Sequence, residues 1–258
     1  MRYFRYIGVL FICIFSFIYT EKIANLSLEN SQVYQDILNE ENKYNISFVN
    51  AEVNGDYIVP GLNGKVVNVK SSFYNMRDIN TFNSYYLIYD TSYPDVTVND
   101  FKEKVINKGN SYKKSVSFII EYDEKIINYF KDKKIEASIL VNIDNFNKNE
   151  KMEQINNDVS NYKRLDSLIS KYSKNSNICY LTNENEKICR SLKKYLVKTD
   201  KVLDNTSILK LKDSISSGDI YLLSKGVDVG KLDSFVKSVI YKDLNIIGLS
   251  SLLSEERD

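Results

Sequence analysis

From about residue 109 onward, short apolar runs alternate with amphipathic stretches, and this alternation limits the fold more than any other feature. Residues 116–120 predict a buried strand, and residues 123–133 predict a helix packed on it. Further strands are expected over 137–143, 178–181, 201–203, 220–223 and 245–249, and helices over 152–172, 184–196, 208–215 and 232–239, followed by a short terminal helix. This order implies a mainly parallel sheet with helices outside. The strands are too few for a closed eight-unit barrel, so an α/β fold with an incomplete or distorted (β/α) barrel is predicted over residues 111–258.

The segment before the barrel has a different pattern. Residues 46–110 contain short stretches of alternating polarity, and the dipeptides Asn54-Gly55 and Pro60-Gly61 are turn signals. Residues 85–89 indicate one more strand. We therefore predict a small β-rich unit with hairpins over 46–110, preceded by a polar stalk helix over residues 23–45.

The N-terminus carries an apolar run, residues 6–19, preceded by Arg2 and Arg5. With its flanking aromatic residues, the segment approaches the roughly 20 residues of a membrane-spanning helix. No small-residue cleavage pattern follows the run, and the residue before Cys13 is too large for a lipoprotein signal. We expect an uncleaved, single-pass transmembrane anchor over residues 1–22, with a cytoplasmic tip and the bulk of the chain outside the cell membrane. A cleaved signal peptide is the alternative.

Composition excludes several classes of function. Lys and Arg number 35 against 34 Asp and Glu, a formal charge of +1, so the chain lacks the basic field that binds nucleic acid. Its nine glycines form no phosphate-binding loop. It contains no histidine, which is the commonest metal ligand and the side chain that titrates nearest neutrality. Chemistry that depends on imidazole is therefore excluded.

Four segments in order carry a resemblance to a known family. They read VPGLNGK at 59–65, IEASILV at 135–141, GDIYLLS at 218–224 and LNIIGLSSLL at 244–253. Residues from about 113 to 254 resemble the polysaccharide deacetylase (NodB homology) family, and the chain is similar to a divergent, degenerate and membrane-anchored member. The resemblance implies a distorted barrel of the NodB type and descent from carbohydrate deacetylases, which hydrolyse C–N bonds.

Deacetylases of that family hold a divalent metal with one Asp and two His, and use a second Asp as base and a further His as acid. The resemblance places Glu121 at the base position and Tyr122 at the metal-binding Asp, with Asp123 one residue away. Ser224 stands where the acid His is expected. It therefore implies no metal and no cofactor here, with Glu121 and Asp123 as vestigial catalytic candidates.

The retained groove is expected to include Tyr122, Tyr180 and Ser224, because tyrosine faces stack on sugar rings. Tyr221 is a further candidate, although aromatic residues on strands are more often core. Carboxylates without histidine can still hold Ca²⁺ or Mg²⁺, or cleave a glycosidic bond. The carboxylates that could do so are Glu121, Asp123, Asp144 and Asp219. The alternative is that these four are ordinary solvated residues in loops at the strand ends.

Two cysteines leave a structural question open. Cys179 lies in an expected strand and Cys189 on the helix that follows it. Outside the cytoplasm such a pair can oxidise, and a strand residue and a residue of the packing helix can lie within disulfide reach. Two buried free thiols are the equal alternative.

Three functional hypotheses follow. The first is a catalytically inactive, extracytoplasmic deacetylase-like protein that binds cell-wall glycan or takes part in envelope assembly. The second is an active carbohydrate deacetylase or hydrolase with a rebuilt, carboxylate-based site. The third is a structural envelope protein whose protein partner the sequence does not identify.

Overall fold

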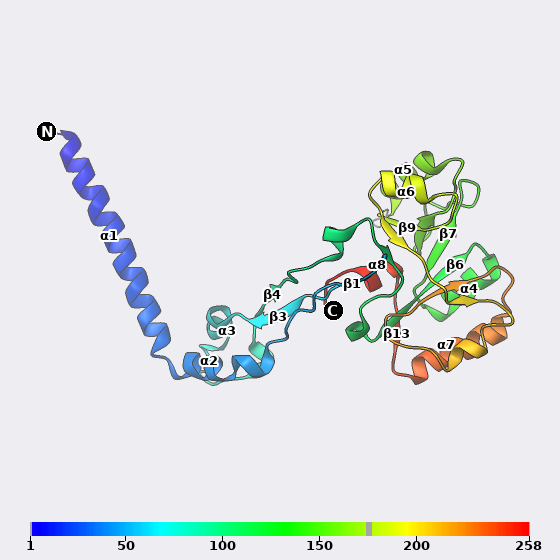
Figure 1. The fold of residues 1–258 in the computed structure, drawn as a ribbon. Helices are drawn as coiled ribbons and strands as arrows, with labels where there is room; N and C mark the ends of the chain where they lie inside the picture. Colours follow the sequence, from blue (N-terminus) through cyan, green and yellow to red (C-terminus); the bar gives the residue numbers. More distant parts are fainter. Residues whose placement is uncertain (1, 174–176, 258) are drawn as a thin grey trace. The chain divides into compact units, whose positions relative to one another are not determined.

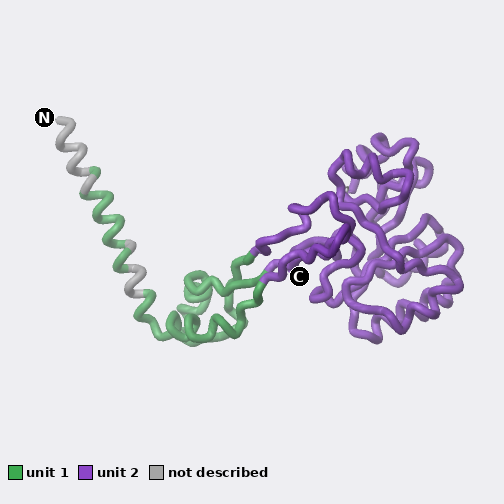
Figure 2. Tube along the Cα trace, in the orientation of Figure 1, with its two compact units in different colours: residues 1–47, 64–92 green, residues 48–63, 93–258 purple. Residues whose placement is uncertain are grey.

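A computed structural model describes residues 2–173 and 177–257 of the chain (Figure 1). The chain forms two compact units, residues 1–47 with 64–92 and residues 48–63 with 93–258 (Figure 2). These boundaries differ from the predicted ones, because the segment 46–110 is shared between the units. Strands near both ends of that segment pair into a sheet of the second unit, and its middle belongs to the first.

The first unit combines helices with a two-stranded antiparallel sheet. Its elements are α1 (Arg2–Glu29), α2 (Gln32–Tyr44), β3 (Gly64–Val67), α3 (Val69–Met76), the 3₁₀ turn η1 (Ser84–Tyr86) and β4 (Tyr89–Ser92). Val33 and Ile37 lie one turn apart on α2 and give this helix an apolar face. They form a small core with Phe73 and Met76 of α3. The expected stalk over 23–45 is therefore divided between α1 and α2, and α2 belongs to a packed core.

Apart from Met1, which lies outside the described residues, the predicted anchor over residues 1–22 falls within α1. In the described part of the chain, no helix is long and apolar enough to cross a membrane. The transmembrane anchor is therefore not supported.

The second unit contains two sheets. Among the described residues, a six-stranded sheet has the order β11-β12-β6-β7-β8 with β13 also paired to β6, and a five-stranded sheet has the order β1-β2-β5-β10-β9. The first comprises β6 (Ser115–Glu121), β7 (Ser138–Val141), β8 (Glu153–Asn156), β11 (Val202–Leu203), β12 (Ile220–Leu223) and β13 (Asn245–Ile246). The second comprises β1 (Glu52–Asn54), β2 (Tyr57–Val59), β5 (Val105–Ile106), β9 (Ile178–Tyr180) and β10 (Tyr195–Val197). These strands pair in parallel except in the β1–β2 hairpin, whose turn is the predicted Asn54-Gly55.

The two sheets enclose one apolar interior. β8 lies against β9, although the two belong to different hydrogen-bonded sheets. Ile119, Leu140 and Ile155 of the first sheet meet Tyr180 and Val197 of the second in this interior. Because hydrogen bonding is interrupted between the sheets, the arrangement is an incompletely closed barrel, as the strand and helix order predicts.

Helices cover the outside of β6. Alternate residues of a strand face opposite sides, so Phe118 points away from the interior. Its ring lies 5.5 Å from that of Phe130 and 6.1 Å from that of Phe235. These two residues belong to α4 (Glu124–Lys133) and α7 (Val229–Tyr241), which lie together beside β6 (Figure 1). The remaining elements are α5 (Tyr162–Tyr172), α6 (Glu186–Ser191), α8 (Leu249–Leu253) and the 3₁₀ turns η2 (Val98–Phe101), η3 (Ser111–Lys113) and η4 (Lys210–Lys212).

Several predicted elements are wrong. Residues 152–172 form β8 and then α5, residues 184–196 form α6 and then β10, and residues 208–215 contain η4 where a longer helix is expected. The expected strand over 85–89 begins only at Tyr89. Met152, Ile155 and Val159 have helical spacing, but pairing with β7 holds residues 153–156 in a strand. Local periodicity does not reveal such pairing, which is why it misled the prediction.

Candidate functional site

Glu121 and Asp123, the two predicted carboxylates, lie at the carboxyl end of β6. Both accept hydrogen bonds from the turn that follows the neighbouring strand β12. Lys225 N donates to Glu121 Oε2 at 3.1 Å, and Gly226 N donates to Asp123 Oδ2 at 2.9 Å. The carboxylates therefore fix this turn across the strand ends.

Asp123 has a second structural role as the N-cap of α4. Its Oδ1 accepts from Lys125 N at 2.9 Å and from Ile126 N at 3.4 Å. Partial burial by itself raises the pKa of Asp123, but the amides of Gly226, Ile126 and Lys125 outweigh it and hold the pKa below its usual value. Both carboxylate oxygens are thus occupied, and the group is a poor proton acceptor at neutral pH.

The predicted groove residues do not all face the same side. Tyr122 follows Glu121 and packs on the outer core, where it lines an open depression of about 830 Å³ beside the first turns of α4 and α7. Tyr180 lies in the barrel interior and is 8% exposed. Burial raises the pKa of Tyr180, and the negative charges of Glu121 and Asp200 raise it further. The structure therefore places Tyr180 in the barrel interior and Tyr122 on the other side of the sheet.

Ser224 lies at the same end of the barrel as Glu121. It is half-buried directly after β12, and its backbone N–H donates to the Leu203 carbonyl at 3.1 Å. In the described part of the chain its hydroxyl makes no hydrogen bond to Glu121 or Tyr180. Ser224 thus borders the candidate site without forming a catalytic pair there.

The other carboxylates lie elsewhere. Asp219, which is 2% exposed, precedes β12 at the opposite end and accepts hydrogen bonds from Lys201 Nζ, Ser216 N and Tyr221 Oη. Tyr221 is fully buried, with its ring 5.6 Å from that of Phe118, so it is a core residue. Asp144 is exposed in the loop after β7.

The residues at the β6 end do not fit the metal of the deacetylases. Within residues 2–173 and 177–257, no three Asp, Glu or Cys side chains are grouped so that they could hold a metal ion, and the sequence has no histidine. A cation at Asp123 would also have to displace the amide of Gly226 and the cap of α4. The oxygen atoms at this end therefore stabilise a turn and a helix terminus, and they do not form a set of metal ligands.

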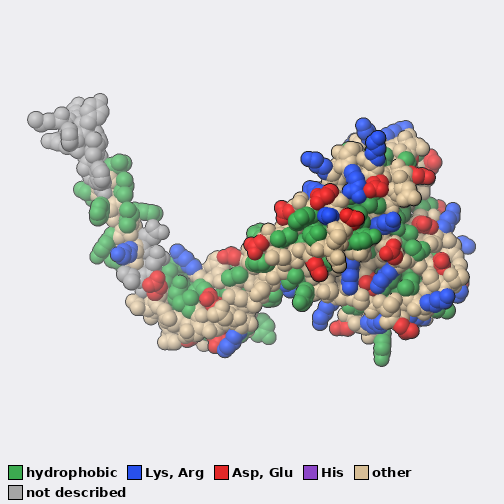
Figure 3. Space-filling view, viewed as in Figure 1, with side chains coloured by type: hydrophobic (Ala, Val, Ile, Leu, Met, Phe, Trp, Pro, Cys, Tyr) green, Lys and Arg blue, Asp and Glu red, His purple; other side chains and the backbone are tan. Residues whose placement is uncertain are grey.

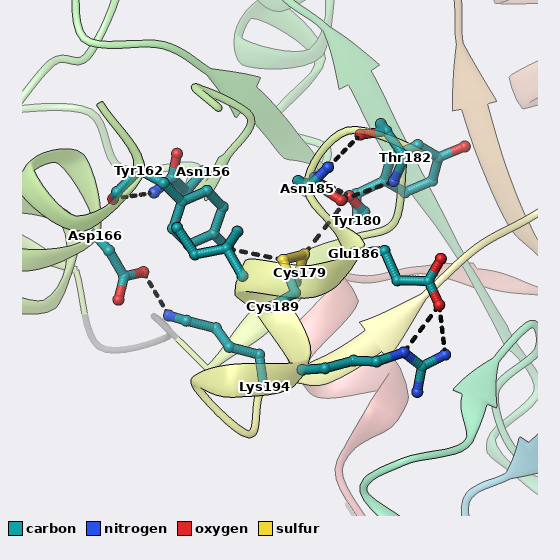
Figure 4. Close-up of a disulfide and its surroundings, with 12 residues drawn as sticks. Asn156, Tyr162, Asp166, Cys179, Tyr180, Thr182, Asn185, Glu186, Cys189 and Lys194 are labelled. Atoms are coloured by element: carbon teal, nitrogen blue, oxygen red, sulfur yellow. Dashed lines mark hydrogen bonds and ion pairs between the residues drawn. A yellow bond between two sulfur atoms is a disulfide. The ribbon is translucent and has the colours of Figure 1, made fainter. Parts of the chain in front are cut away.

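Cys179 and Cys189 form a disulfide between β9 and α6 (Figure 4). Their Sγ atoms are 2.03 Å apart and their Cα atoms 6.2 Å apart. Both are buried, and the hydroxyl of Tyr162 lies 3.3 Å from the Cys189 sulfur. Lys194, which follows α6, pairs with Asp166 of α5. Of the two alternatives that the sequence leaves open, the structure contains the bond.

Sequence reasoning missed the turn that engages the carboxylates. Gly226 has a φ of 78°, in the left-handed region that favours glycine. Its position shortly after an apolar strand signals a tight turn. Nothing local signals that the amides of Lys225 and Gly226 bind residues a hundred positions earlier.

The barrel and its α4–α7 face define a mixed α/β fold, and comparisons with known proteins show where this fold occurs. No family model matches the chain. The uncharacterized protein YlxY of Bacillus subtilis (strain 168) is 25% identical over 125 residues, which cover 46% of this chain. The match spans only 39% of the length of that relative.

Solved structures give broader matches. The chain is similar to BA3943, a CE4 family pseudoenzyme from Bacillus anthracis, with a TM-score of 0.63 at 16% identity over 88% of this chain and 96% of that one. A BA3943 mutant described as having restored enzymatic activity gives a TM-score of 0.63 at 17% identity, over 88% of this chain and 99% of that one. The chain therefore has the fold of CE4 proteins, which are polysaccharide deacetylases, and the fold implied by the sequence resemblance is confirmed.

Proposed function

We propose that this chain is a catalytically inactive, deacetylase-like protein that lies outside the cytoplasm and binds cell-wall glycan. The observation that carries the loss of activity is the engagement of Glu121 and Asp123 by the turn at Lys225 and Gly226. A general base needs access to the proton it removes and a pKa near the working pH. Asp123 is instead saturated by amides and has a lowered pKa.

The comparisons support this proposal. BA3943 shares the fold and is described as a pseudoenzyme, so this architecture exists without catalysis. Its family consists of polysaccharide deacetylases, and retention of a glycan-binding surface is the simplest reason for a protein to keep their fold. Fold alone does not fix function, so glycan binding requires its own test.

The disulfide supports the location. Disulfides persist in oxidising compartments and are rare in the cytoplasm. The buried Cys179–Cys189 bond therefore favours an extracytoplasmic site, where cell-wall glycan is accessible.

The activity test uses the full chain and soluble N-acetylglucosamine oligomers, with and without added Zn²⁺. We expect acetate release no greater than in a protein-free blank. Release that Glu121→Gln or Asp123→Asn abolishes would establish the second hypothesis, an active carboxylate-based site. Asp132→Asn is the matched control, because Asp132 is an exposed residue of the adjacent helix α4.

The binding test is isothermal titration of the full chain with soluble peptidoglycan fragments, together with retention on insoluble peptidoglycan. We expect measurable heat and retention. Absence of both would contradict glycan binding and favour the third hypothesis, a structural envelope protein.

A further inference from the structure

A second groove lies in the second unit, between α6 and the outer face of the five-stranded sheet. It encloses about 400 Å³, within the roughly 300–1,000 Å³ typical of ligand pockets. Its residues come from β2, β5, α6 and the turns after β9 and β10. Its lining includes Asp56, Tyr57, Asn183, Glu186, Arg190 and Lys198.

The floor of the groove contains one exposed aromatic ring. Tyr57 pairs in register with Val105, and Val105 with Leu196, so the three side chains share one face of the sheet. Over β10 that face is covered, and Leu196 packs with Cys189 of α6. The cover does not extend to β2, where Tyr57 is 43% exposed. The sheet therefore presents a tyrosine beside a helical wall.

That wall is held in place. Arg190 donates from Nε to Glu186 Oε1 at 2.8 Å and from Nη1 to the Glu103 carbonyl at 2.7 Å. Figure 4 shows Thr182 and Glu186 on the side of α6 that faces away from Tyr162. The wall thus has a defined geometry before any ligand binds, which lowers the entropic cost of binding.

Several polar side chains of the lining remain available. Those of Asp56, Asn183 and Lys198 make no hydrogen bond or ion pair with any other described residue. They supply an acceptor, an amide that both donates and accepts, and a donor. An aromatic ring with polar side chains around it suits a sugar. The C–H face of a sugar stacks on the ring, and its hydroxyl groups donate and accept hydrogen bonds with the polar side chains.

Charge and backbone geometry argue against other ligands. The acidic lining residues Asp56, Glu103 and Glu186 balance the basic ones Lys104, Arg190 and Lys198. Acidic and basic side chains are likewise interspersed over the visible face of this unit (Figure 3). A phosphate polymer therefore finds no net attraction. β2 and β5 are paired on both edges, so an extended peptide has no free strand to join.

One turn joins the groove to the strand that carries Tyr180. Asn185, which is fully buried, donates from Nδ2 to the Tyr180 carbonyl at 2.9 Å, and its Oδ1 accepts from Thr182 N at 2.8 Å. Tyr180 belongs to the barrel interior, and Thr182 lines the groove. The groove therefore borders the carboxyl end of β9, directly after the interior residue Tyr180.

We propose that this groove is a carbohydrate-binding subsite in which one ring of a neutral glycan chain stacks on Tyr57. Asp56, Asn183 and Lys198 bind the hydroxyl and amide groups of the sugar. The inference rests on the proposed glycan-binding function and adds the residues that perform it.

The test is isothermal titration of the full chain with an N-acetylglucosamine tetramer. Tyr57→Ala should weaken binding about tenfold, because the stacking face is lost, whereas Tyr57→Phe keeps the ring and should bind within about threefold of the native chain. Tyr85→Ala is the matched control and should bind normally, because Tyr85 is 95% exposed and belongs to the other unit.

A fluorescent variant covers the case in which Tyr57→Ala fails to fold. The chain has no tryptophan, so Tyr57→Trp introduces a single indole whose emission should change on addition of the tetramer. Tyr85→Trp should show no change.

The outcomes separate the two proposals. Equal binding by the native chain and Tyr57→Ala, or unchanged indole emission while the native chain binds, overturns the groove assignment and leaves the proposed function standing. No binding by the native chain overturns the proposed function. Displacement of the tetramer by a free stem peptide assigns the groove to peptide and overturns the carbohydrate subsite.

Discussion

The two ends of the parallel strands both hold carboxyl groups, and the two groups differ in their electrostatics. At the carboxyl end, amide hydrogen bonds lower the pKa of Asp123 despite partial burial. At the amino end, burial raises the pKa of Glu153, although hydrogen bonds from Ser138 Oγ at 2.6 Å and Ser250 N at 3.2 Å offset part of the effect. Its Oε1 is buried without a hydrogen-bond partner among the described residues.

The difference shows that a perturbed carboxyl pKa does not by itself mark a functional site in this protein. A carboxyl group with a raised pKa is often a sign of an active site. Here the raised pKa belongs to Glu153, at the end of the barrel that α8 closes. The Ser138 hydroxyl donates a hydrogen bond to Glu153 and accepts one from Leu249 N of α8. The carboxyl end of the strands, where sites of parallel α/β folds generally lie, holds an amide-saturated carboxylate instead. In this barrel the pKa of a carboxyl group is raised where burial outweighs its hydrogen bonds, as at Glu153, and lowered where amide hydrogen bonds outweigh burial, as at Asp123.

The closed amino end should be the more sensitive to lost apolar volume. Leu252 of α8 is fully buried, and a methyl group on Gly109 would come within 2.6 Å of its Cγ, so the packing is tight. Leu252→Ala should lower the free energy of unfolding by about 2–5 kcal/mol in urea denaturation. The control Leu209→Ala, at a position 51% exposed, should change it by less than about 0.5 kcal/mol. Equal losses at both positions would break the contrast.

The packing of α6 on the five-stranded sheet should depend on its covalent link. The Cys179–Cys189 bond closes a loop with a sequence separation of 10, which in the chain-entropy model stabilises by about 2–3 kcal/mol. Replacing both residues with Ser should lower the free energy of unfolding by that amount. Mass spectrometry after alkylation under denaturing conditions should find only Cys13 modified without reductant, and all three cysteines with it. Modification of Cys179 and Cys189 without reductant would remove the bond and its support for an extracytoplasmic location.

Glu153 should make the closed end sensitive to rising pH. Its pKa is raised from 4.5 on folding, so its contribution to stability is complete below about pH 4.5 and is lost as pH rises through the folded-state pKa. Across that window the native chain should lose stability relative to Glu153→Gln, by at most about 1.4 kcal/mol per pH unit. Urea denaturation at a series of pH values measures this. The control Glu256→Gln, at an exposed position, should show the same pH dependence of stability as the native chain. If Glu153→Gln also shows that pH dependence, the raised pKa of Glu153 is contradicted.

Asp123 should show the opposite sign and a smaller effect. Its folded-state pKa lies below 3.8, so its contribution is present above about pH 3.8 and is lost as pH falls through that pKa. Asp123→Ala should cost about 1 kcal/mol at neutral pH, because the α4 cap is lost and the Gly226 amide is left unpaired. Asp132→Ala is the control on the same helix. The difference between the native chain and Asp123→Ala should shrink in acid, and a difference that stays constant would show that the charge is not what stabilises.

Local sequence patterns were sufficient where an element's own residues decide its structure. The apolar run of β6, the amphipathic α4 and the Asn54-Gly55 hairpin were predicted because each signal lies within the element. β8 and β10 were missed because pairing with distant strands overrides helical spacing. β1, β2 and β5 were assigned to the wrong unit for the same reason, which also concealed the groove at Tyr57.

The candidate site was predictable in part. The family resemblance placed Glu121 and Asp123 at the end of β6, where the structure has them. It gave no sign of the donors at Lys225 and Gly226, because a hydrogen bond between turns 103 or 104 residues apart leaves no local pattern. Tyr122 was expected in the groove although strand alternation turns it away from Glu121.

Glu121 should give the smallest effect of all. It accepts one hydrogen bond, from Lys225 N at 3.1 Å, and glutamine keeps an oxygen that can accept it. Glu121→Gln should therefore change the free energy of unfolding by less than about 0.5 kcal/mol, measured by urea denaturation beside the larger loss in Asp123→Ala. A vestigial base is dispensable for ligand binding, whereas a residue that still contacts ligand is not. A large loss of glycan affinity in Glu121→Gln, with stability unchanged, would therefore show that the carboxyl end still contacts ligand directly. That result would move the binding surface from the Tyr57 groove toward the barrel interior at Tyr180.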